Sequence, residues 1–428
     1  MSMPIIMLFV VMAICFIIRM PVSFSMLAAS ITYFLLAAPD KLGQVFTVIT
    51  GNMFANYTML AAPLFIFMAN VLNEGEVTDK LFSFCNGLLG RLKGGTARVN
   101  VFISLIFSGM TGSAIADASG IGLMEIDQMK KEGYDAEFSC AITAASATVG
   151  PIFPPSIPMV IYAMLSGASI GKLFMGGMVP GVLLAILLMI YVAFISHKRN
   201  YPAGVVMSKR EFLKATLQAL PALFTVVILL GGIYSGICTP TEAGAVASAY
   251  ALIISALIYK TLGWKKLWGI IKKSAANTAT LALLCGTSML FSYIISLEQV
   301  PRVVASLVMG ITDNKYIFLF IVNIVFLLLG CVLDVSTIQL VFVPMVLPLV
   351  QAMGIDLVHF GVVICLNMMI GLSTPPFGML LFIVSGLGKT KIKGVIREIL
   401  PMVLIMIGLL FLVTYVPDII MFIPNNFM

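Results

Sequence analysis

Long stretches without an internal charge dominate this sequence. They lie near residues 4–18, 20–38, 56–72, 174–196, 216–237, 243–259, 276–297 and 399–418. A helix needs about 20 mainly apolar residues to cross the hydrocarbon core of a bilayer. Of the 428 residues, 61% are hydrophobic and 10% are charged, which leaves too little charge to cover a water-exposed surface. The sequence therefore excludes a soluble enzyme and predicts an all-α polytopic membrane protein.

The net charge of +7 does not indicate binding to nucleic acid. The basic residues form short clusters between the apolar stretches, such as the linker SHKRNYPAGVVMSKREFLK at 196–214, and such clusters are typical of cytoplasmic loops. The seven cysteines occur singly in apolar sequence and there are only two histidines, so no transition-metal site is expected.

Segments rich in Gly, Ser, Thr and Pro interrupt the apolar pattern. They cover residues 95–111, 117–129 and 136–170, and they recur within 315–386. These segments look too short or too broken for simple spans. Broken helices at membrane depth are tolerated only where they are buried in protein or line a cavity. We therefore expect the functional site to lie in these segments.

An internal repeat relates the interrupted segments to one another. When the sequence is compared with itself at one fixed shift, several residues coincide. Single glycines can coincide by chance, but two consecutive prolines that coincide at the same shift favour duplication into halves of about 1–200 and 215–428. A shift of 221 residues pairs Gly109 with Gly330, Gly133 with Gly354, Asp135 with Asp356, Gly150 with Gly371, Pro154 and Pro155 with Pro375 and Pro376, and Pro180 with Pro401.

Charge sidedness predicts how the two halves are oriented. We suppose that 95–129 is a re-entrant hairpin from the cytoplasm, that 315–353 is one from the other side, and that the N-terminus is outside. Only four of the 25 Lys and Arg residues then face outward, namely Lys41, Lys172, Arg302 and Lys315. This skew agrees with the positive-inside rule, and the halves become inverted repeats, as in many secondary transporters. Amphipathic stretches at 75–94 and 298–312 are expected to lie along the interface before each hairpin.

Each half has a polar hairpin tip followed by a Pro-rich break. SGMTGSAIADASG (108–120) precedes VGPIFPPSIP (149–158), and GCVLDVST (330–337) precedes GLSTPPFG (371–378). Pro removes a backbone donor and Gly lets the chain turn, so these strings should unwind a membrane helix. Freed carbonyls and hydroxyls suit Na⁺, whereas the N-termini of half-helices suit an anion. The alternative is that these residues only kink and pack the helices.

Three acidic side chains lie within apolar sequence, where an ionisable group is costly. Asp334 in the second tip is expected near a second cation or the substrate, or else as a lock that hydrogen-bonds the hairpin backbone. Asp117, beyond the first tip, is either an ion ligand or a hairpin clasp. Glu242 in TPTEAGA is expected to cap a helix, with a role in transport as the alternative. Arg302 is expected to pair with a substrate carboxylate, with an interfacial anchor as the alternative.

Five strings resemble a known family in their order along the chain. FSGMTGSAIADASG, GPIFPPSIPMVIY, TPTEAGAVA, GIDLVHFGVVI and GLSTPPFGMLLF look like the large membrane subunit of tripartite ATP-independent periplasmic (TRAP) transporters, over essentially the whole chain. The resemblance implies an inverted-repeat ion-transporter-type fold with two re-entrant hairpins and two broken helices that moves as an elevator. It implies Na⁺-coupled import of carboxylates without ATP, in the bacterial inner membrane. Two partners are implied, a four-helix membrane subunit and a periplasmic substrate-binding protein.

The same resemblance implies at least two Na⁺ sites and a substrate site. Thr111 stands where relatives have Ser, Phe153 would contribute only its backbone, and Val332 lacks the hydroxyl of Thr111. The first Na⁺ set comprises Ser108, Thr111, Gly150, Phe153 and Pro155. The second set, placed by the repeat, comprises Gly330, Val332, Gly371, Thr374 and Pro376. The substrate set comprises Ser113, Ser156, Asp334 and Arg302.

In such an elevator, 1–94 and 215–312 form a scaffold with one arm helix each, 95–195 and 313–428 form the transport domain, and 196–214 link the halves. QVPRVVAS looks somewhat more like sialic-acid (N-acetylneuraminate) members than C4-dicarboxylate members. A stand-alone Na⁺/carboxylate symporter of similar hairpin design is the alternative. A membrane enzyme or a proton-conducting subunit would need a nucleophile with its base, a metal cluster or a chain of buried charges, and the sequence indicates none of these.

Overall fold

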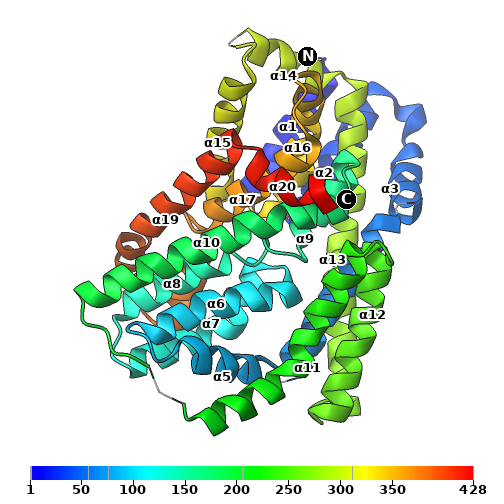
Figure 1. Ribbon diagram of the computed structural model, residues 1–428. Coiled ribbons are helices and arrows are strands. Elements are labelled where there is room, and N and C mark those ends of the chain that lie inside the picture. Colours follow the sequence, from blue (N-terminus) through cyan, green and yellow to red (C-terminus); the bar gives the residue numbers. More distant parts are fainter. Residues whose placement is uncertain (1, 56, 76, 205–206, 311, 428) are drawn as a thin grey trace.

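The computed structural model describes residues 2–55, 57–75, 77–204, 207–310 and 312–427, without the side chains of 52–55, 58 and 108–111. Regular structure in these ranges is helical, apart from one isolated antiparallel bridge between Lys93 and Ala203. Figure 1 shows the helices in two groups that meet along the middle of the molecule. The α-helices are α1 (Met3–Ile17), α2 (Val22–Ala37), α3 (Gln44–Ala55), α4 (Ala61–Glu74), α5 (Val77–Leu89), α6 (Gly95–Thr111), α7 (Ala114–Lys131), α8 (Ala136–Ala147), α9 (Ile157–Ser166), α10 (Ile170–Lys198), α11 (Lys209–Tyr234), α12 (Pro240–Ile253), α13 (Trp264–Leu297), α14 (Val300–Met309), α15 (Lys315–Val332), α16 (Val335–Ala352), α17 (Leu357–Leu372), α18 (Met379–Gly388), α19 (Ile392–Tyr415) and α20 (Asp418–Phe427).

The apolar stretches form helices, as predicted. Within the described ranges, seven helices are long and apolar enough to cross a membrane: α10, α11, α12 with its π-helical extension Ile254–Ile258, α13, α15, α16 and α19. Two of these correct the sequence analysis, because α15 and α16 had been expected to be too broken for spans. Each is a continuous helix of 18 residues, and α16 accommodates Pro344 and Pro348 in its interior. The chain is thus an all-helical, multi-pass membrane protein.

The element boundaries repeat at the 221-residue offset found in the sequence. The hairpin α6–α7 corresponds to α15–α16, and α7 and α16 match end to end under this shift. The broken helix α8–α9 corresponds to α17–α18, and both breaks contain a cis peptide, Pro154-Pro155 and Pro375-Pro376. The arm helices α5 and α14 precede the two hairpins as expected. Each half therefore contains an arm, a hairpin and a broken helix in the same order.

Buried amides tie each hairpin to its own broken helix. In the first half, Asn100 on α6 accepts a hydrogen bond from Ser146 on α8 at 2.6 Å and donates one to Thr143 at 2.7 Å. In the second half, Asn367 on α17 donates to the side-chain oxygen of Asn323 on α15 at 3.0 Å. Hydrogen bonds between buried polar side chains hold together the elements that they join. Each hairpin and its broken helix therefore form one unit.

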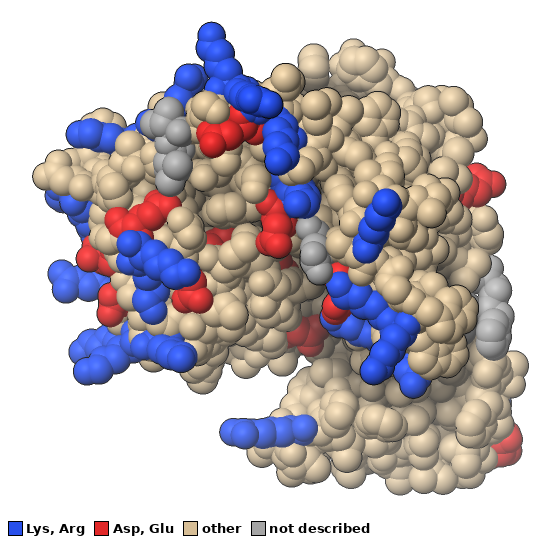
Figure 2. All heavy atoms as spheres, turned by 90° about the horizontal axis from the view of Figure 1, so that it is seen from below, with Lys and Arg blue, Asp and Glu red and all other residues tan. Residues whose placement is uncertain are grey.

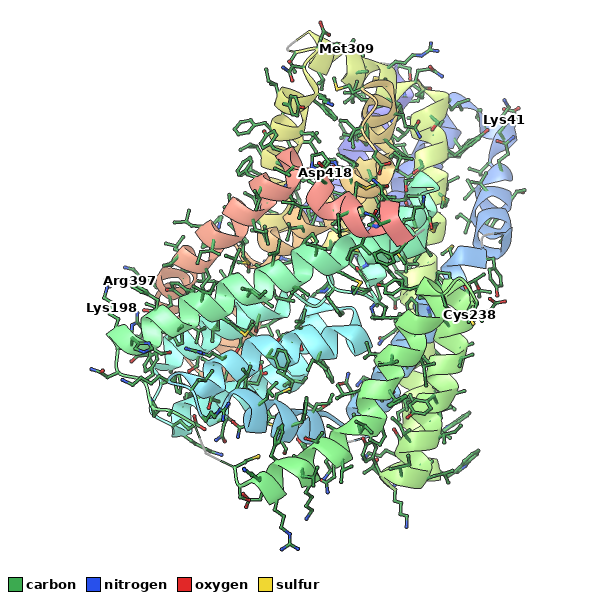
Figure 3. The ribbon with its side chains drawn as sticks, viewed as in Figure 1. Lys41, Lys198, Cys238, Met309, Arg397 and Asp418 are labelled. Atoms are coloured by element: carbon green, nitrogen blue, oxygen red, sulfur yellow. The ribbon has the colours of Figure 1, made fainter. Side chains whose placement is uncertain are left out.

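A further group of helices packs against these units. α1, α2 and the second half of α13 share a separate hydrophobic cluster, which includes Phe34 and Phe291 and touches α16 through Val341. Lys and Arg side chains gather on the face seen from below in Figure 2. In Figure 3, Lys198 and Arg397 lie at the left edge, away from Lys41 at the upper right. This separation has the pattern that the positive-inside rule gives a cytoplasmic face.

Candidate functional site

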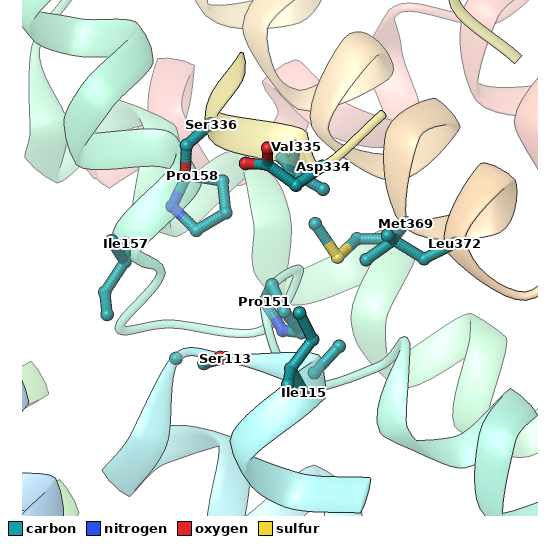
Figure 4. A pocket seen from close by; sticks show the side chains of 12 residues that line it. Ser113, Ile115, Pro151, Ile157, Pro158, Asp334, Val335, Ser336, Met369 and Leu372 are labelled. Carbon is teal, nitrogen blue, oxygen red and sulfur yellow. The ribbon is translucent and has the colours of Figure 1, made fainter. Parts of the chain in front are cut away.

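Both hairpin tips and both breaks meet at one cavity of about 110 Å³. Figure 4 shows Ser113 and Asp334 on opposite sides of it, each at the tip of its own hairpin. The two sequence segments that had been expected to form tips are thus brought together, although they lie more than 200 positions apart. The lining residues are Gly112, Ser113, Ala114, Ile115, Pro151, Ile157, Pro158, Asp334, Val335, Ser336, Met369 and Leu372.

The first tip folds closely onto the first break. Gly112 has a φ of +58°, which favours glycine, and a Cβ there would lie 2.8 Å from the carbonyl oxygen of Pro155. Ser113 is the N-cap of α7 and accepts a hydrogen bond from the Ala116 amide at 3.4 Å. The tip therefore presents the N-terminus of α7 to the cavity and touches a carbonyl expected at the first Na⁺ site.

The second tip has the same design with a carboxylate as its cap. Asp334 is the N-cap of α16 and accepts a hydrogen bond from the Thr337 amide at 3.1 Å, and the Thr337 hydroxyl also donates to it. Asp334 thus accepts a hydrogen bond from the backbone of its own hairpin helix, and it also lines the cavity. Both roles are therefore open to a test by substitution.

Three helix N-termini converge on this cavity. The first residues of α7, α9 and α16 contribute Ala114, Ile157 and Val335 to its lining. The N-terminus of a helix carries a partial positive charge and unsatisfied N–H groups, which favour an anion such as a carboxylate. The convergence supplies positive potential without a basic side chain at membrane depth.

The second break depends on contact between two glycines. A Cβ on Gly371 would lie 2.6 Å from the Cα of Gly330, so α15 and α17 approach backbone to backbone. Thr374 donates its hydroxyl to the Ile370 carbonyl at 2.6 Å. The Val332 side chain is 62% exposed. Of the second predicted Na⁺ set, Gly330, Gly371 and Thr374 thus lie close together, whereas the Val332 side chain points outward.

The structure locates three of the five residues of the first predicted Na⁺ set in one segment. Gly150 and Pro155 lie in the nonhelical segment between α8 and α9, where carbonyl oxygens lack the donors of a regular helix. Phe153 lies in the same segment. The side chains of Ser108 and Thr111, at the end of α6, lie outside the described part of the structure.

Two residues of the predicted substrate set lie elsewhere. Ser156 is fully buried, donates to the Pro151 carbonyl and accepts from the Met159 amide at 3.2 Å, so it caps α9. Arg302 is exposed on the arm helix α14, outside the cavity. Ser113 and Asp334 therefore remain as the members that face the cavity.

The predictions for the other two acidic side chains, Glu242 and Asp117, have different outcomes. Glu242 forms a capping box with Thr239, with N···O distances of 2.8 and 3.3 Å, which confirms the capping interpretation. Asp117 is 3% exposed, and within the described residues its Oδ2 atom has no hydrogen-bond partner. The structure leaves its two interpretations open.

The cavity continues toward the basic side of the molecule. A second cavity of about 410 Å³ shares Ser113, Asp334 and Ser336 with the first. A third, of about 520 Å³, shares Asn73 and Asn277 with the second and reaches Glu74, Asp79 and Lys273. Together they form a path from the tips to the ends of α4 and α13.

The amides on this path were not anticipated. Asn70 and Asn73 come from α4, and Asn277 comes from α13. Asn70 and Asn277 lie within the predicted spans 56–72 and 276–297, and Asn73 directly follows the first of them. The sequence could have indicated them, because an amide side chain in or beside an apolar run needs a hydrogen bond with a polar group or water.

Comparisons with known proteins identify similar membrane permeases. Residues 9–419 match the family described as "Tripartite ATP-independent periplasmic transporter, DctM component". The sialic acid TRAP transporter large permease protein SiaM of Vibrio cholerae is 38% identical over 409 residues, 96% of each chain. The C4-dicarboxylate TRAP transporter large permease protein DctM of Pseudomonas aeruginosa is 36% identical over 370 residues, 86% of this chain and 87% of that one.

A solved structure shares the fold at low sequence identity. The crystal structure of the YdaH transporter of Alcanivorax borkumensis superposes with a TM-score of 0.61 and 16% identity, covering 92% of this chain and 91% of that one. The relatives at higher identity are permeases. By its match over nearly its whole length, the chain belongs to the DctM component family of the tripartite ATP-independent periplasmic transporters.

Proposed function

We propose that this chain is the large permease of a Na⁺-coupled importer of carboxylates in the bacterial inner membrane. The observation that carries the proposal is the convergence of the N-termini of α7, α9 and α16 on one cavity between the two hairpin tips. Helix N-termini favour an anion there, and Asp334, which caps α16, lies across the cavity from Ser113. Relatives named for sialic acid and for C4-dicarboxylates support a carboxylate substrate.

Na⁺ is the coupling ion in this proposal. The nonhelical segments after α8 and α17 offer carbonyl and hydroxyl oxygens, which suit a hard monovalent cation. The two proposed Na⁺ sites are those predicted from the sequence, with Val332 contributing at most its backbone oxygen. The sequence contains no GxxxxGK[ST] string for ATP.

Sialic acid, as N-acetylneuraminate, is the proposed substrate, because SiaM is the relative at 38% identity and is named for it. The proposed partners are a small four-helix membrane subunit and a periplasmic substrate-binding protein, as the tripartite family description suggests. A stand-alone symporter is the competing proposal, and uptake without either partner would favour it.

Uptake into proteoliposomes tests both the coupling and the substrate class. With both partners and an inward Na⁺ gradient, labelled N-acetylneuraminate is expected to accumulate, because ion entry drives the anion inward. Replacing Na⁺ by K⁺ on both sides is expected to remove the accumulation. Equal uptake in Na⁺ and K⁺ would contradict the coupling, and uptake of succinate alone would contradict the substrate.

The elevator movement is proposed to slide the hairpins and broken helices (95–195 and 313–428) against the scaffold (1–94 and 215–312), with 196–214 as the cytoplasmic link between inverted halves. An apolar seal supports it, formed by Ile161 of α9, Cys285 of α13 and Leu340 of α16. The seal lies between the path described above and a separate cavity of about 250 Å³ at the other ends of α9 and α13.

Thiol labelling of the seal tests the movement. In a variant with Cys285 as the sole cysteine, the thiol is expected to resist a membrane-impermeant maleimide at rest, because it is buried. Labelling should accelerate roughly tenfold during Na⁺-driven turnover, when α9 and α16 slide away from α13. A sole-cysteine variant at Cys365, buried within α17 away from the seal, is the control and should stay unlabelled. An unchanged Cys285 rate during turnover would argue against sliding at this contact.

A further inference from the structure

We propose that Asn73 and Asn277 form a second binding station for the substrate, on the scaffold wall of the path, which recognises hydroxyl and amide groups. This inference rests on the proposed function and deepens it, because it names the features that the substrate must carry. Both side chains line the cavities of about 410 and 520 Å³. Within the described residues neither amide forms a hydrogen bond with another protein side chain.

The two amides are held in place by a neighbouring contact. Asn70 donates to the Ser274 hydroxyl at 2.9 Å in a buried position, one helical turn from each of them. Glu74 pairs with Lys273 at 3.2 Å, and Ile66 lines the same cavity as Leu281, so α4 and α13 run antiparallel here.

The spacing of the amides follows from helix geometry. Asn73 lies three residues beyond Asn70 on α4, and Asn277 lies three residues beyond Ser274 on the antiparallel α13. At about 1.5 Å rise per residue, the two amides are separated by about 9 Å along the path. A station of this length suits an extended, polyhydroxylated acid that engages both amides at once.

The opposite wall of the larger cavity offers little hydrogen bonding. It is formed by α7 with Ala116, Ser119, Gly120, Ile121 and Met124. The Ser119 hydroxyl already donates to the Ile115 carbonyl of its own helix at 2.7 Å. Recognition of polar groups in this cavity therefore depends on the scaffold side, where an amide both donates and accepts.

The charge at the mouth of the path disfavours a second carboxylate on the substrate. Lys273 is paired with Glu74, and Asp79 lines the same cavity, so the mouth carries a net negative charge. Like charges repel, and a dicarboxylate would meet this repulsion twice. The station thus fits a monocarboxylate that bears several hydroxyl groups and an amide, and it fits a plain dicarboxylate poorly.

Transport kinetics of the complete complex test the station. Asn73→Ala and Asn277→Ala are each expected to lower kcat/KM for N-acetylneuraminate roughly threefold to tenfold, because each removes one hydrogen bond. For succinate, both variants should stay within about twofold of the unsubstituted complex. Ser119→Ala is the matched control in the same cavity and should leave both substrates unchanged. Asn277→Gln keeps an amide and should recover part of the loss, which separates recognition from a fold defect.

The outcomes are distinct. An equal fall for both substrates, or no fall for either, would overturn the station while leaving Na⁺-coupled carboxylate import intact. Uptake of succinate but not N-acetylneuraminate by the unsubstituted complex would also overturn it. Failure of the unsubstituted complex to take up either acid would instead count against the proposed function itself.

Discussion

Gly371→Ala is expected to reduce transport at least tenfold and to lower the thermal stability of the purified protein. The added methyl group would lie 2.6 Å from the Cα of Gly330 and 2.7 Å from its carbonyl carbon. Neither backbone can move aside as a flexible side chain would, so α15 and α17 must separate at the second break. Overpacking of this kind costs about 1–3 kcal/mol, and here it also displaces the oxygens proposed to bind Na⁺.

Gly408→Ala is the matched control for this substitution. Gly408 lies within α19, and no atom outside its local helix comes within 4 Å of an added Cβ. Alanine is the better helix former by about 1 kcal/mol, so stability should be unchanged or slightly higher. The measurements are Na⁺-driven uptake and the melting temperature in detergent. Normal transport by Gly371→Ala would show that the glycine contact is dispensable.

Asp334→Ala is expected to lower uptake about tenfold or more and to destabilise the protein by about 1 kcal/mol. The two losses have separate causes. Removal of the N-cap leaves the Thr337 amide without its acceptor, and removal of the carboxylate takes a charge from the wall of the cavity. Uptake and thermal unfolding, measured on the same preparation, report these effects independently.

Asp334→Ser separates the cap from the charge. Serine is as good an N-cap as aspartate, so the melting temperature should return to that of the unsubstituted protein. Uptake should stay low, because the serine hydroxyl cannot replace the carboxylate at a cation or at a substrate hydroxyl. Recovery of uptake together with stability would mean that Asp334 serves only to cap α16.

The sequence predicted the helices and the tips well for a physical reason. In lipid, backbone groups must be satisfied within the chain, so an apolar run has little choice other than a helix. The tips and breaks were visible because Gly and Pro act on the backbone locally, and their twin spacing of 221 residues marks equivalent places in the two halves. Glu242 was interpreted correctly because a capping box is also local.

The errors arose where tertiary packing decides. The region 315–386 was expected to contain segments too short or too broken for simple spans, but within it α16 continues as one helix through Pro344 and Pro348. Ser156 looked like a substrate contact, whereas its hydroxyl is used to close the first break. The amides of Asn73 and Asn277 were missed because an isolated polar residue in an apolar run does not indicate which neighbour it faces. These features depend on contacts between distant segments.

The convergence of the N-termini of α7, α9 and α16 also affects how the two halves attract one another when no substrate is bound. The N-termini of α7 and α9 in the first half face that of α16 in the second, and Asp334 places a carboxylate at the α16 end, so opposite charges meet across the cavity even without a bound anion. This attraction adds to direct contacts between the two units, such as the hydrogen bond from the Tyr162 hydroxyl to the Leu357 carbonyl at 2.8 Å. The carboxylate of Asp334 therefore helps to hold the two halves of the chain together, in addition to capping its own helix.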